Sequence, residues 1–292
     1  MGVKLVTDSS CDFPLSFLEE NKDIFHILPC YIDLGGKTLI DDFGVSYDLK
    51  QFYVDIRAGI KPRTSMVTPN RFAALYTEFI EAGHEIVYCG FSSALGGVHN
   101  SSTLAAMQVK AEYPDAKIYI VDTLSASIGL SICCMEAVKM VRAGKSGAEV
   151  AEHLDRIKMH VNHWFGVDGL KFLKDGGRIS PMVAMIGTTL NIKPTLTIDR
   201  LGRIVPAGKV RGRRKSIETL SDKVVQRYDP DFGSVIGIGH ADCETDALEL
   251  ERILRTKFPE AEFMLVNLHI TIATHVGPGM LAVAFYGKER EE

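Results

Sequence analysis

Hydrophobic residues in the first half of the chain alternate between short continuous runs and longer segments with an apolar residue every three or four positions. The runs VKLVT, EIVYCGF and KIYIVD are rich in β-branched and aromatic residues, which is typical of strands. The segments between them have the period of an α-helix, and we expect helices over 48–58, 69–82, 96–112 and 127–142. This alternation predicts an α/β fold.

Several of these helices carry signals at their starts. Thr68 and Ser180 each precede a proline, which favours the first helical position, and Ser146 with Glu149 has the spacing of a capping box. We also interpret Ser10 and Ser127 as plain N-caps.

The second half shows a different pattern of predicted elements. After a helix expected over 146–159, the segment IKPTLTIDRLGRIVPAGKV predicts a hairpin, and it is followed by two helices and three further strands. We therefore expect two α/β domains, residues 1–163 and 164–292, with a ligand cleft between them. The later elements are helices over 213–228 and 246–258 and the strands SVIGIG, FMLVNLHI and MLAVAFY.

Composition limits the class of protein. The net charge of −4 argues against a general nucleic-acid-binding protein. The six cysteines show no C-x-x-C spacing, which fits a reducing cytosol. We see no signal peptide and no apolar run near the roughly 20 residues of a membrane span, and we expect a cytoplasmic protein with at most transient membrane contact.

Loops rich in small hydroxyls follow the predicted strands. Three segments occupy this position, TDSSCD, FSSALGG and DTLSAS, and a fourth, RTSMVTP, leads into a helix. Helix N-termini at the carboxyl edge of a sheet offer free N–H groups to anions, so these loops suit a carboxylate or a phosphate. Helix capping explains each single serine equally well. The candidate ligand-binding residues are Thr64, Ser65, Ser92, Ser93 and Gly96.

Two turns in the second half place charged or titratable groups among glycines. Arg178 follows Gly176 and Gly177 in LKDGGRIS, and His275 precedes Gly277 in ATHVGPGM. Capping and tight turns explain the glycines, but not the cation and the imidazole. Both groups suit a phosphate or a proton transfer.

The basic segment KVRGRRK contains Arg211, Arg213 and Arg214 between the hairpin and a helix. It is either solvated surface or a docking site for an acidic partner or a phosphorylated ligand. RAGKSG lacks the first glycine of a P-loop. His153, His160 and His163 have no carboxylate or cysteine in ligand spacing, so we expect structural histidines and no metal.

A serine hydrolase is the main alternative. GFSSA resembles the nucleophile elbow G-x-S-x-G, and Asp122 and His275 follow Ser92 in the order of a hydrolase triad. Ala94 replaces the final glycine of that motif.

Seven segments, taken in order, resemble the DegV family, whose lipid-carrying members are the fatty-acid-binding subunits of bacterial fatty acid kinase. They are VTDSSCDFP, TSMVTP, FSSALGG, VDTLSAS, LKDGGRIS, NIKPTLTID and HVGPG. The resemblance covers nearly the whole chain. It implies two α/β domains around a buried long-chain fatty acid, with the carboxyl group near the domain boundary.

By this resemblance, Thr64 and Ser93 would hydrogen-bond the carboxyl group with help from Ser92, and Arg178 and His275 would lie where a separate kinase subunit acts. That subunit would carry ATP and metal and form an acyl phosphate, so this chain would present substrate without a cofactor or catalytic residue of its own.

The sequence departs from the family pattern at Met66 and Val67, where Gln-Pro is common, and at Gly96, Val98 and His99, where Ser, Thr and Tyr are common. These changes remove polar groups near the implied carboxyl site, and His99 either replaces a lost hydroxyl or faces solvent. In PMVAMIG, the residues Met182, Met185 and Ile186 either line the tunnel or pack in the core.

Overall fold

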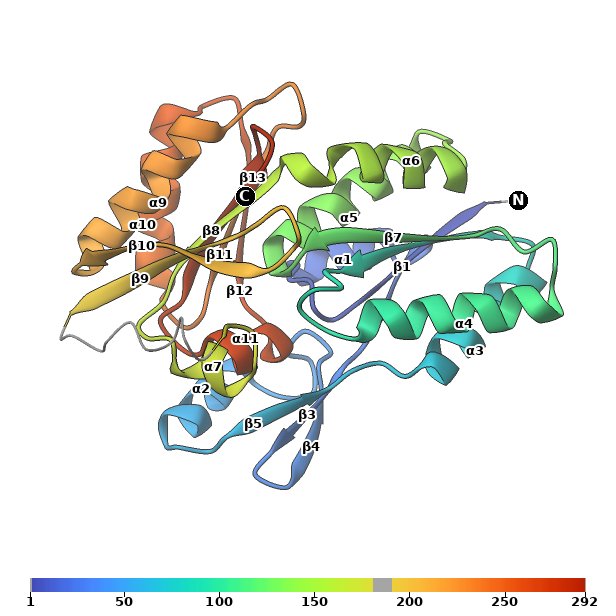
Figure 1. Ribbon diagram of the computed structural model, residues 1–292, viewed down its shortest axis with the longest axis horizontal. Coiled ribbons are helices and arrows are strands. Elements are labelled where there is room, and N and C mark those ends of the chain that lie inside the picture. The colour runs from blue at the N-terminus through green and yellow to red at the C-terminus, as the bar shows by residue number, and fades with distance from the viewer. Residues whose placement is uncertain (1, 181–190, 292) are drawn as a thin grey trace.

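The computed structural model describes residues 2–180 and 191–291 (Figure 1). A parallel four-stranded sheet, in the order β2-β1-β6-β7, is built entirely from residues 3–125. Helices α3 and α4 contact one face of this sheet, and α5 and α6 contact the other. Its strands are β1 (Val3–Asp8), β2 (Phe25–Leu28), β6 (Glu85–Phe91) and β7 (Ile118–Ser125).

The second sheet is mixed and has six strands in the order β10-β9-β8-β13-β11-β12, all from residues 161–286. Only β11 and β12 pair in parallel. Helices α9 and α10 contact strands of this sheet. The strands are β8 (Val161–Gly166), β9 (Ile192–Ile198), β10 (Ile204–Arg211), β11 (Val235–His240), β12 (Glu262–Asn267) and β13 (Leu281–Tyr286).

A small antiparallel sheet, which the sequence did not predict, lies beside α7 and α11 in the lower part of Figure 1. Its strands are β4 (Lys37–Ile40), β3 (Tyr31–Leu34) and β5 (Pro62–Ser65). The described helices are α1 (Leu15–Asn21), α2 (Leu49–Arg57), α3 (Pro69–Glu81), α4 (Val98–Glu112), α5 (Ser127–Arg142), α6 (Gly147–Ile157), α7 (Lys171–Asp175), α9 (Arg213–Arg227), α10 (Glu244–Lys257) and α11 (Ile270–Val276), with a short 3₁₀ turn η1 (Lys158–His160).

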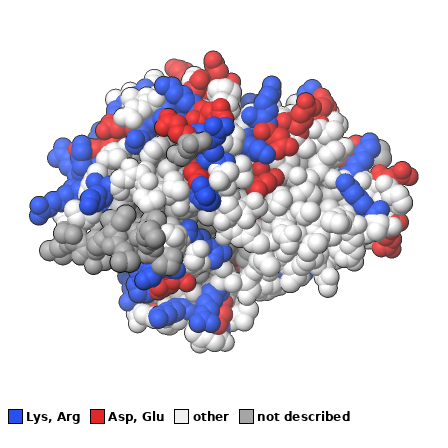
Figure 2. All heavy atoms as spheres, viewed as in Figure 1, with Lys and Arg blue, Asp and Glu red and all other residues white. Residues whose placement is uncertain are grey.

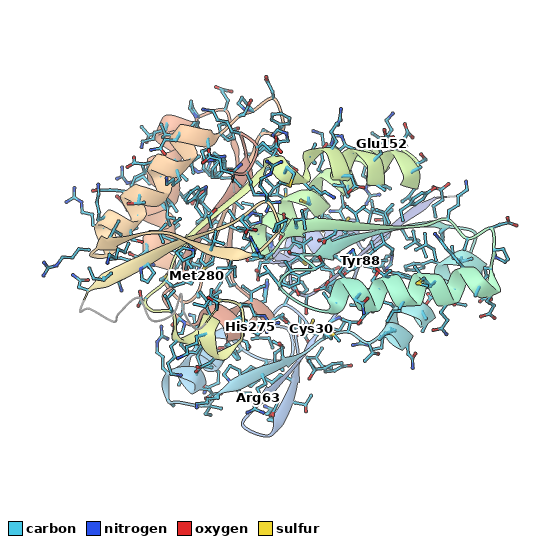
Figure 3. The ribbon with its side chains drawn as sticks, viewed as in Figure 1. Cys30, Arg63, Tyr88, Glu152, His275 and Met280 are labelled. Atoms are coloured by element: carbon cyan, nitrogen blue, oxygen red, sulfur yellow. The ribbon has the colours of Figure 1, made fainter. Side chains whose placement is uncertain are left out.

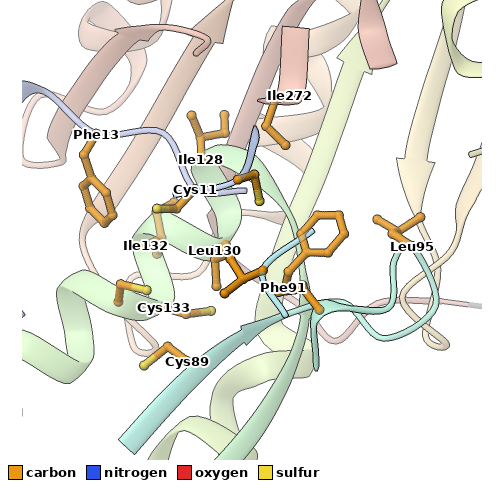
Figure 4. Packing of buried hydrophobic residues seen from close by; sticks show 14 of the residues in the cluster. Cys11, Phe13, Cys89, Phe91, Leu95, Ile128, Leu130, Ile132, Cys133 and Ile272 are labelled. Carbon is orange, nitrogen blue, oxygen red and sulfur yellow. The ribbon is translucent and has the colours of Figure 1, made fainter. Parts of the chain in front are cut away.

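Helix α5 is buried between the two large sheets. It contacts β1, β6 and β7 on one side and β8, β11 and β13 on the other. All residues of its first two turns are buried, and they are apolar apart from Ser127 and Ser131, whose hydroxyls are hydrogen-bonded, which makes this burial favourable. Figure 4 shows Ile128, Leu130, Ile132 and Cys133 packed in this layer. The two sheets are therefore joined by one shared hydrophobic core.

The α/β fold predicted from the sequence is confirmed. The domain division after residue 163 cuts β8, which pairs wholly within the second sheet. We therefore propose that the second domain begins with β8, at Val161, close to the predicted position.

The predicted end of one strand is wrong. The segment expected to be a strand through Ile270 leaves the sheet at Asn267, and residues 270–276 form α11. The sequence ITIATHV is rich in β-branched residues, which disfavour helix, so its pattern indicates a strand. Contacts with distant carboxylates, described below, favour the helix instead.

The capping predictions have different outcomes in the structure. The capping box is present: the Ser146 hydroxyl accepts a bond from the Glu149 N–H at 3.3 Å, and the Glu149 carboxylate accepts one from the Ser146 N–H at 3.0 Å. Thr68 precedes α3 but its side chain makes no capping bond. Ser127 is the first residue of α5 and not its N-cap, and its hydroxyl donates to Asp12. Pro181, which follows Ser180, lies outside the described residues.

We predict that Ser146→Ala lowers the free energy of unfolding by about 1 kcal/mol, because it leaves an N–H group of the first turn of α6 without its acceptor. Thr68→Ala is a matched control, since the exposed Thr68 side chain makes no such bond, and it should change stability by less than about 0.5 kcal/mol. Urea unfolding of both variants measures the difference. Equal losses would contradict the assignment of the capping box.

Candidate functional site

The site is built around α11, whose start is held by two buried carboxylates. Asp12, in the loop after β1, accepts bonds from the His269 N–H at 2.7 Å and from the Ser127 hydroxyl at 2.5 Å. Asp41 accepts a bond from the Thr271 N–H at 2.9 Å. Negative charge at a helix N-terminus is favourable, and these bonds satisfy N–H groups that the helix itself leaves free. They tie α11 to both the first sheet and α5.

His275 lies in the last turn of α11 and faces strand β5. Its Nε2 atom is 3.0 Å from the Thr64 hydroxyl, from a residue 211 positions away. Its Nδ1 atom is buried and has no hydrogen-bond partner among the described residues. Burial, reinforced by the nearby positive charge of Arg178, lowers the pKa of His275 to about 4. The imidazole is therefore neutral near pH 7.

Arg178 approaches the same point from the end of α7. Gly176 ends this helix, and the Arg178 guanidinium donates to the Gly176 carbonyl. A Cβ atom at Gly176 would lie 2.4 Å from Nδ1 of His275, so glycine allows the imidazole to pack there. Arg178 is half-buried, and no carboxylate within the described part of the chain forms an ion pair with it. Burial lowers the pKa of Arg178 from its ordinary value, but the guanidinium stays charged.

An apolar tunnel begins at Arg178 and His275. The space between the atoms in and around it, with open solvent at the mouth included, is about 600 Å³. Figure 4 shows four of its wall side chains, Phe91, Leu95, Ile128 and Ile272. The wall is completed by Ala126, Ser127, His163, Trp164, Phe165, Leu173, Ile198, Ile204, Val276, Met280, Ala282 and Val283.

Two other hollows meet the tunnel at Arg178 and His275. One is a chamber of mixed polarity that includes Thr64, Gly96 and Cys30. The other is an open groove whose cationic side chains are Lys61, Arg63, Lys171 and Arg178. In Figure 3, His275 lies between Met280 of the tunnel, Cys30 of the chamber and Arg63 of the groove. Polarity thus rises in steps from the tunnel to the outer groove.

The structure brings Thr64, Gly96, Arg178 and His275 together, but not the other predicted ligand-binding residues. Ser65 is exposed on β5 next to Thr64, because successive side chains of a strand point to opposite faces. The buried Ser92 hydroxyl donates to the Gly202 carbonyl at 2.8 Å and holds the turn between β9 and β10. Ser93 is exposed and lines neither the tunnel nor the chamber.

The same contacts bear on the hydrolase alternative. The Ser92 hydroxyl is bonded to Gly202, and Asp122 accepts N–H bonds from Ser93 and Leu124. His275 is bonded to Thr64. Within the described residues, no hydrogen bond joins Ser92, Asp122 and His275, so this arrangement lacks the relay that a serine nucleophile requires.

The basic segment after the hairpin is only partly exposed. Figure 2 shows Lys and Arg gathered on the side of the molecule that carries α9, α10 and the β9–β10 hairpin. Arg211 and Arg214 are exposed there. Arg213 instead donates to Asp246 at 2.8 Å and to the Gly279 carbonyl at 2.7 Å, so the structure uses it to hold the turn beside α11 and it is not free for docking.

Further expectations from the sequence concern three tunnel candidates, metal binding and membrane spans. Met182, Met185 and Ile186 lie outside the described residues. Across residues 2–180 and 191–291, no cluster of three or more His, Cys, Asp or Glu side chains is arranged to hold a metal ion. None of the helices described here has the length and apolar character needed to cross a membrane.

Sequence reasoning missed the cationic groove. Lys61 and Arg63 stand in a segment whose small sheet was not predicted, and nothing in their spacing distinguishes them from other surface cations.

The fold and these hollows define an α/β protein of two large sheets and one small sheet, with an apolar tunnel that opens between the large ones. The chain belongs to the DegV family, whose model, described as that of an uncharacterised protein family, matches residues 2–288. A DegV domain-containing protein of Clostridium perfringens is 37% identical over 98% of each chain. A fatty acid-binding protein of Thermotoga maritima is 34% identical over 100% of each chain.

A solved structure gives the same architecture. The Streptococcus pneumoniae Fatty Acid Kinase (Fak) B3 protein loaded with linoleic acid matches with a TM-score of 0.86 and 22% identity, over 99% of this chain and 100% of that one. This likeness shows the fold. The resemblance to the DegV family and the expectation of two α/β domains are therefore confirmed.

The low pKa of His275 generates a prediction about stability. Between pH 6.5 and 4 the unfolded chain gains a proton at His275 that the folded protein excludes, so this residue makes the protein less stable as the pH falls. His275→Gln removes that effect. Across this window the unmodified protein should lose about 3 kcal/mol more stability than the variant, as measured by urea unfolding. Parallel pH profiles for the two proteins would contradict a buried neutral imidazole.

Proposed function

We propose that this protein binds a long-chain fatty acid, with the acyl tail in the apolar tunnel and the carboxyl group at Thr64 and His275. The observation that carries the proposal is the meeting of an almost wholly apolar tunnel with a half-buried polar pair and one cation at its mouth. A tunnel of this kind matches the hydrocarbon tail, and the polar mouth matches a single anionic end. The fatty acid-binding relative of Thermotoga maritima supports this class of ligand.

The chemistry at the mouth suits a carboxyl group. The Thr64 hydroxyl and the neutral His275 ring both donate or accept hydrogen bonds, so they can hold a carboxyl group without adding a second buried ion. Arg178 supplies the one positive charge that offsets the carboxylate. At Gly96, in the chamber wall, a Cβ atom would lie 3.2 Å from the Phe91 ring, so glycine relieves a tight contact there.

We further propose that the protein presents this carboxyl group to a separate kinase subunit, which would supply ATP and metal and form an acyl phosphate. The groove lined by Lys61, Arg63 and Lys171 is the route by which phosphate would approach, since cations there attract it. The similarity in fold to the Fak B3 protein supports this role. In this scheme the present chain contributes position and charge, and the exposed Arg211 and Arg214 are available to an acidic partner.

Mass spectrometry of an organic extract from freshly purified protein tests the first step. We expect a long-chain fatty acid in about equimolar amount, absent from a control protein prepared in the same way. Lipid-free protein should then take up a C16 or C18 acid in a titration. Protein that yields no such acid and binds none would overturn the proposal.

Thr64→Val should weaken fatty acid binding about tenfold, because it removes one hydrogen bond to the carboxyl group while keeping the shape of the side chain. Ser65→Ala is the matched control: Ser65 is the next residue of β5 but faces away from the site, so its affinity should not change. A titration of both variants with the same acid makes the comparison. Equal affinities for the two variants would place the carboxyl group elsewhere.

Arg178→Met should impair acyl phosphate formation by the kinase subunit from the same organism more than it impairs fatty acid binding, because it removes charge where the phosphate arrives. Arg252→Met, at an exposed arginine of α10 that the scheme does not use, controls for loss of general surface charge. Acyl phosphate trapped with hydroxylamine measures the rate. A normal rate at saturating lipid would remove Arg178 from the transfer step.

A further inference from the structure

The rim of the chamber continues into an uncharged surface on helix α4. No Asp, Glu, Lys or Arg occurs between Phe91 and Val109, a segment that contains most of this helix. Two large apolar side chains of α4 nevertheless face outward: Leu104 is 47% exposed and Met107 is 65% exposed. In Figure 2 the surface over α4 is almost entirely white, the colour of uncharged residues. Most of this helix therefore presents an apolar, uncharged face outward.

Met66 connects this surface to the chamber. Its side chain is 52% exposed, and it lines the chamber together with Gly97. A Cβ atom at Gly97 would lie 2.9 Å from Sδ of Met66, and the Ser101 hydroxyl is 4.0 Å from the same sulfur, so Met66 lies over the first turn of α4. We call Met66, Gly97, Leu104 and Met107 the α4 strip. At 1.5 Å per helical residue, it extends for about 15 Å from the chamber rim.

The other side of the mouth is cationic. Strand β5 leads from one side to the other: Lys61 and Arg63 line the groove, Thr64 lies at the mouth, and Met66 begins the α4 strip. The cations suit phosphate groups by their charge, whereas the strip suits an apolar protein surface. A partner that reaches the mouth therefore meets two surfaces of different character.

The size and charge of the α4 strip indicate what covers it. A strip about 15 Å long on a helix roughly 10 Å wide is far smaller than the roughly 800 Å² that each partner buries in a stable interface, so it is too small to hold a second copy of this chain by itself. Helices that lie on a membrane carry Lys or Arg beside their apolar side chains, and the segment from Phe91 to Val109 has neither. A protein that covers the strip, the mouth and the groove together gains both area and charge complementarity.

We propose that the α4 strip is the docking surface for the kinase subunit, with an apolar face of that subunit on Leu104 and Met107 and the phosphates of its nucleotide toward Lys61 and Arg63. This inference rests on the proposed function and adds the place where the partner binds. Protein interfaces are enriched in Met and depleted of Lys, Glu and Asp, which matches the composition of the strip. Docking there covers the chamber rim and removes the carboxyl group from water before phosphate transfer.

The test is the rate of acyl phosphate formation by the kinase subunit from the same organism, measured as the concentration of the protein loaded with oleic acid is varied. Leu104→Glu should raise the KM for the loaded protein about tenfold or more and change kcat by less than about twofold, because it buries a charge in the interface without altering the tunnel. Leu248→Glu is the matched control: Leu248 is an exposed leucine of α10, 51% exposed, and its substitution should leave KM unchanged.

Met107→Glu gives an independent reading of the same surface and should also raise KM. Thermal unfolding and the affinity for oleic acid should match those of the unmodified protein in both variants, since Leu104 and Met107 are exposed and lie outside the tunnel wall. An unchanged KM in both variants, or an equal rise in Leu248→Glu, would overturn the docking proposal.

The same variants distinguish the other occupants. If Leu104→Glu abolishes binding to phosphatidylcholine vesicles while KM is unchanged, the strip contacts a membrane, and if it converts a dimer to a monomer in sedimentation velocity while KM is unchanged, the strip contacts a second copy; either result overturns the docking proposal. Unmodified protein that binds no fatty acid, or that supports no acyl phosphate formation, refutes the proposed function itself. A rise in KM confined to the variants of the strip supports both.

Discussion

The burial of α5 against both large sheets is the constraint on which the rest of the structure depends. A helix whose first two turns are buried all round is stable only where both flanks are covered, and here β1, β6 and β7 cover one flank while β8, β11 and β13 cover the other. The halves of the chain therefore share a core. Because Ser127 and Ile128 of the same helix enter the tunnel wall, the helix that joins the halves also shapes the cavity between them.

Two buried carboxylates hold α11, the helix that carries His275, to the elements around it. Asp12 bonds both to Ser127 of α5 and to His269 before α11, so the two helices are held by one side chain. Burial raises the pKa of the second carboxylate, Asp41, to about 6, while its bond to the Thr271 N–H lowers it. These contacts stabilise a seven-residue helix of unfavourable composition and orient His275 toward Thr64. The polar mouth is thus a consequence of packing far from it.

The tunnel, the Thr64–His275 pair and the outer groove differ in polarity, and each suits a different task. The tunnel removes apolar surface from water, the Thr64–His275 pair provides neutral hydrogen-bonding groups, and the cations of the outer groove attract negative charge. Arg178 belongs to all three hollows, which places the charge of its guanidinium at their junction.

Local patterns were enough to predict the type and order of most elements, since helical spacing and capping residues act within a few positions: the helix expected over 127–142 is α5, and the box at Ser146 and Glu149 starts α6. They also predicted that Arg178 stands in a turn after a helix, whereas His275, expected in a turn, lies in helix α11. Contacts between distant segments turn Thr64 toward the site and Ser65 away from it, bond Ser92 to Gly202, and make residues 270–276 helical. These outcomes depend on contacts between residues more than a hundred positions apart, and local periodicity carries no information about such contacts.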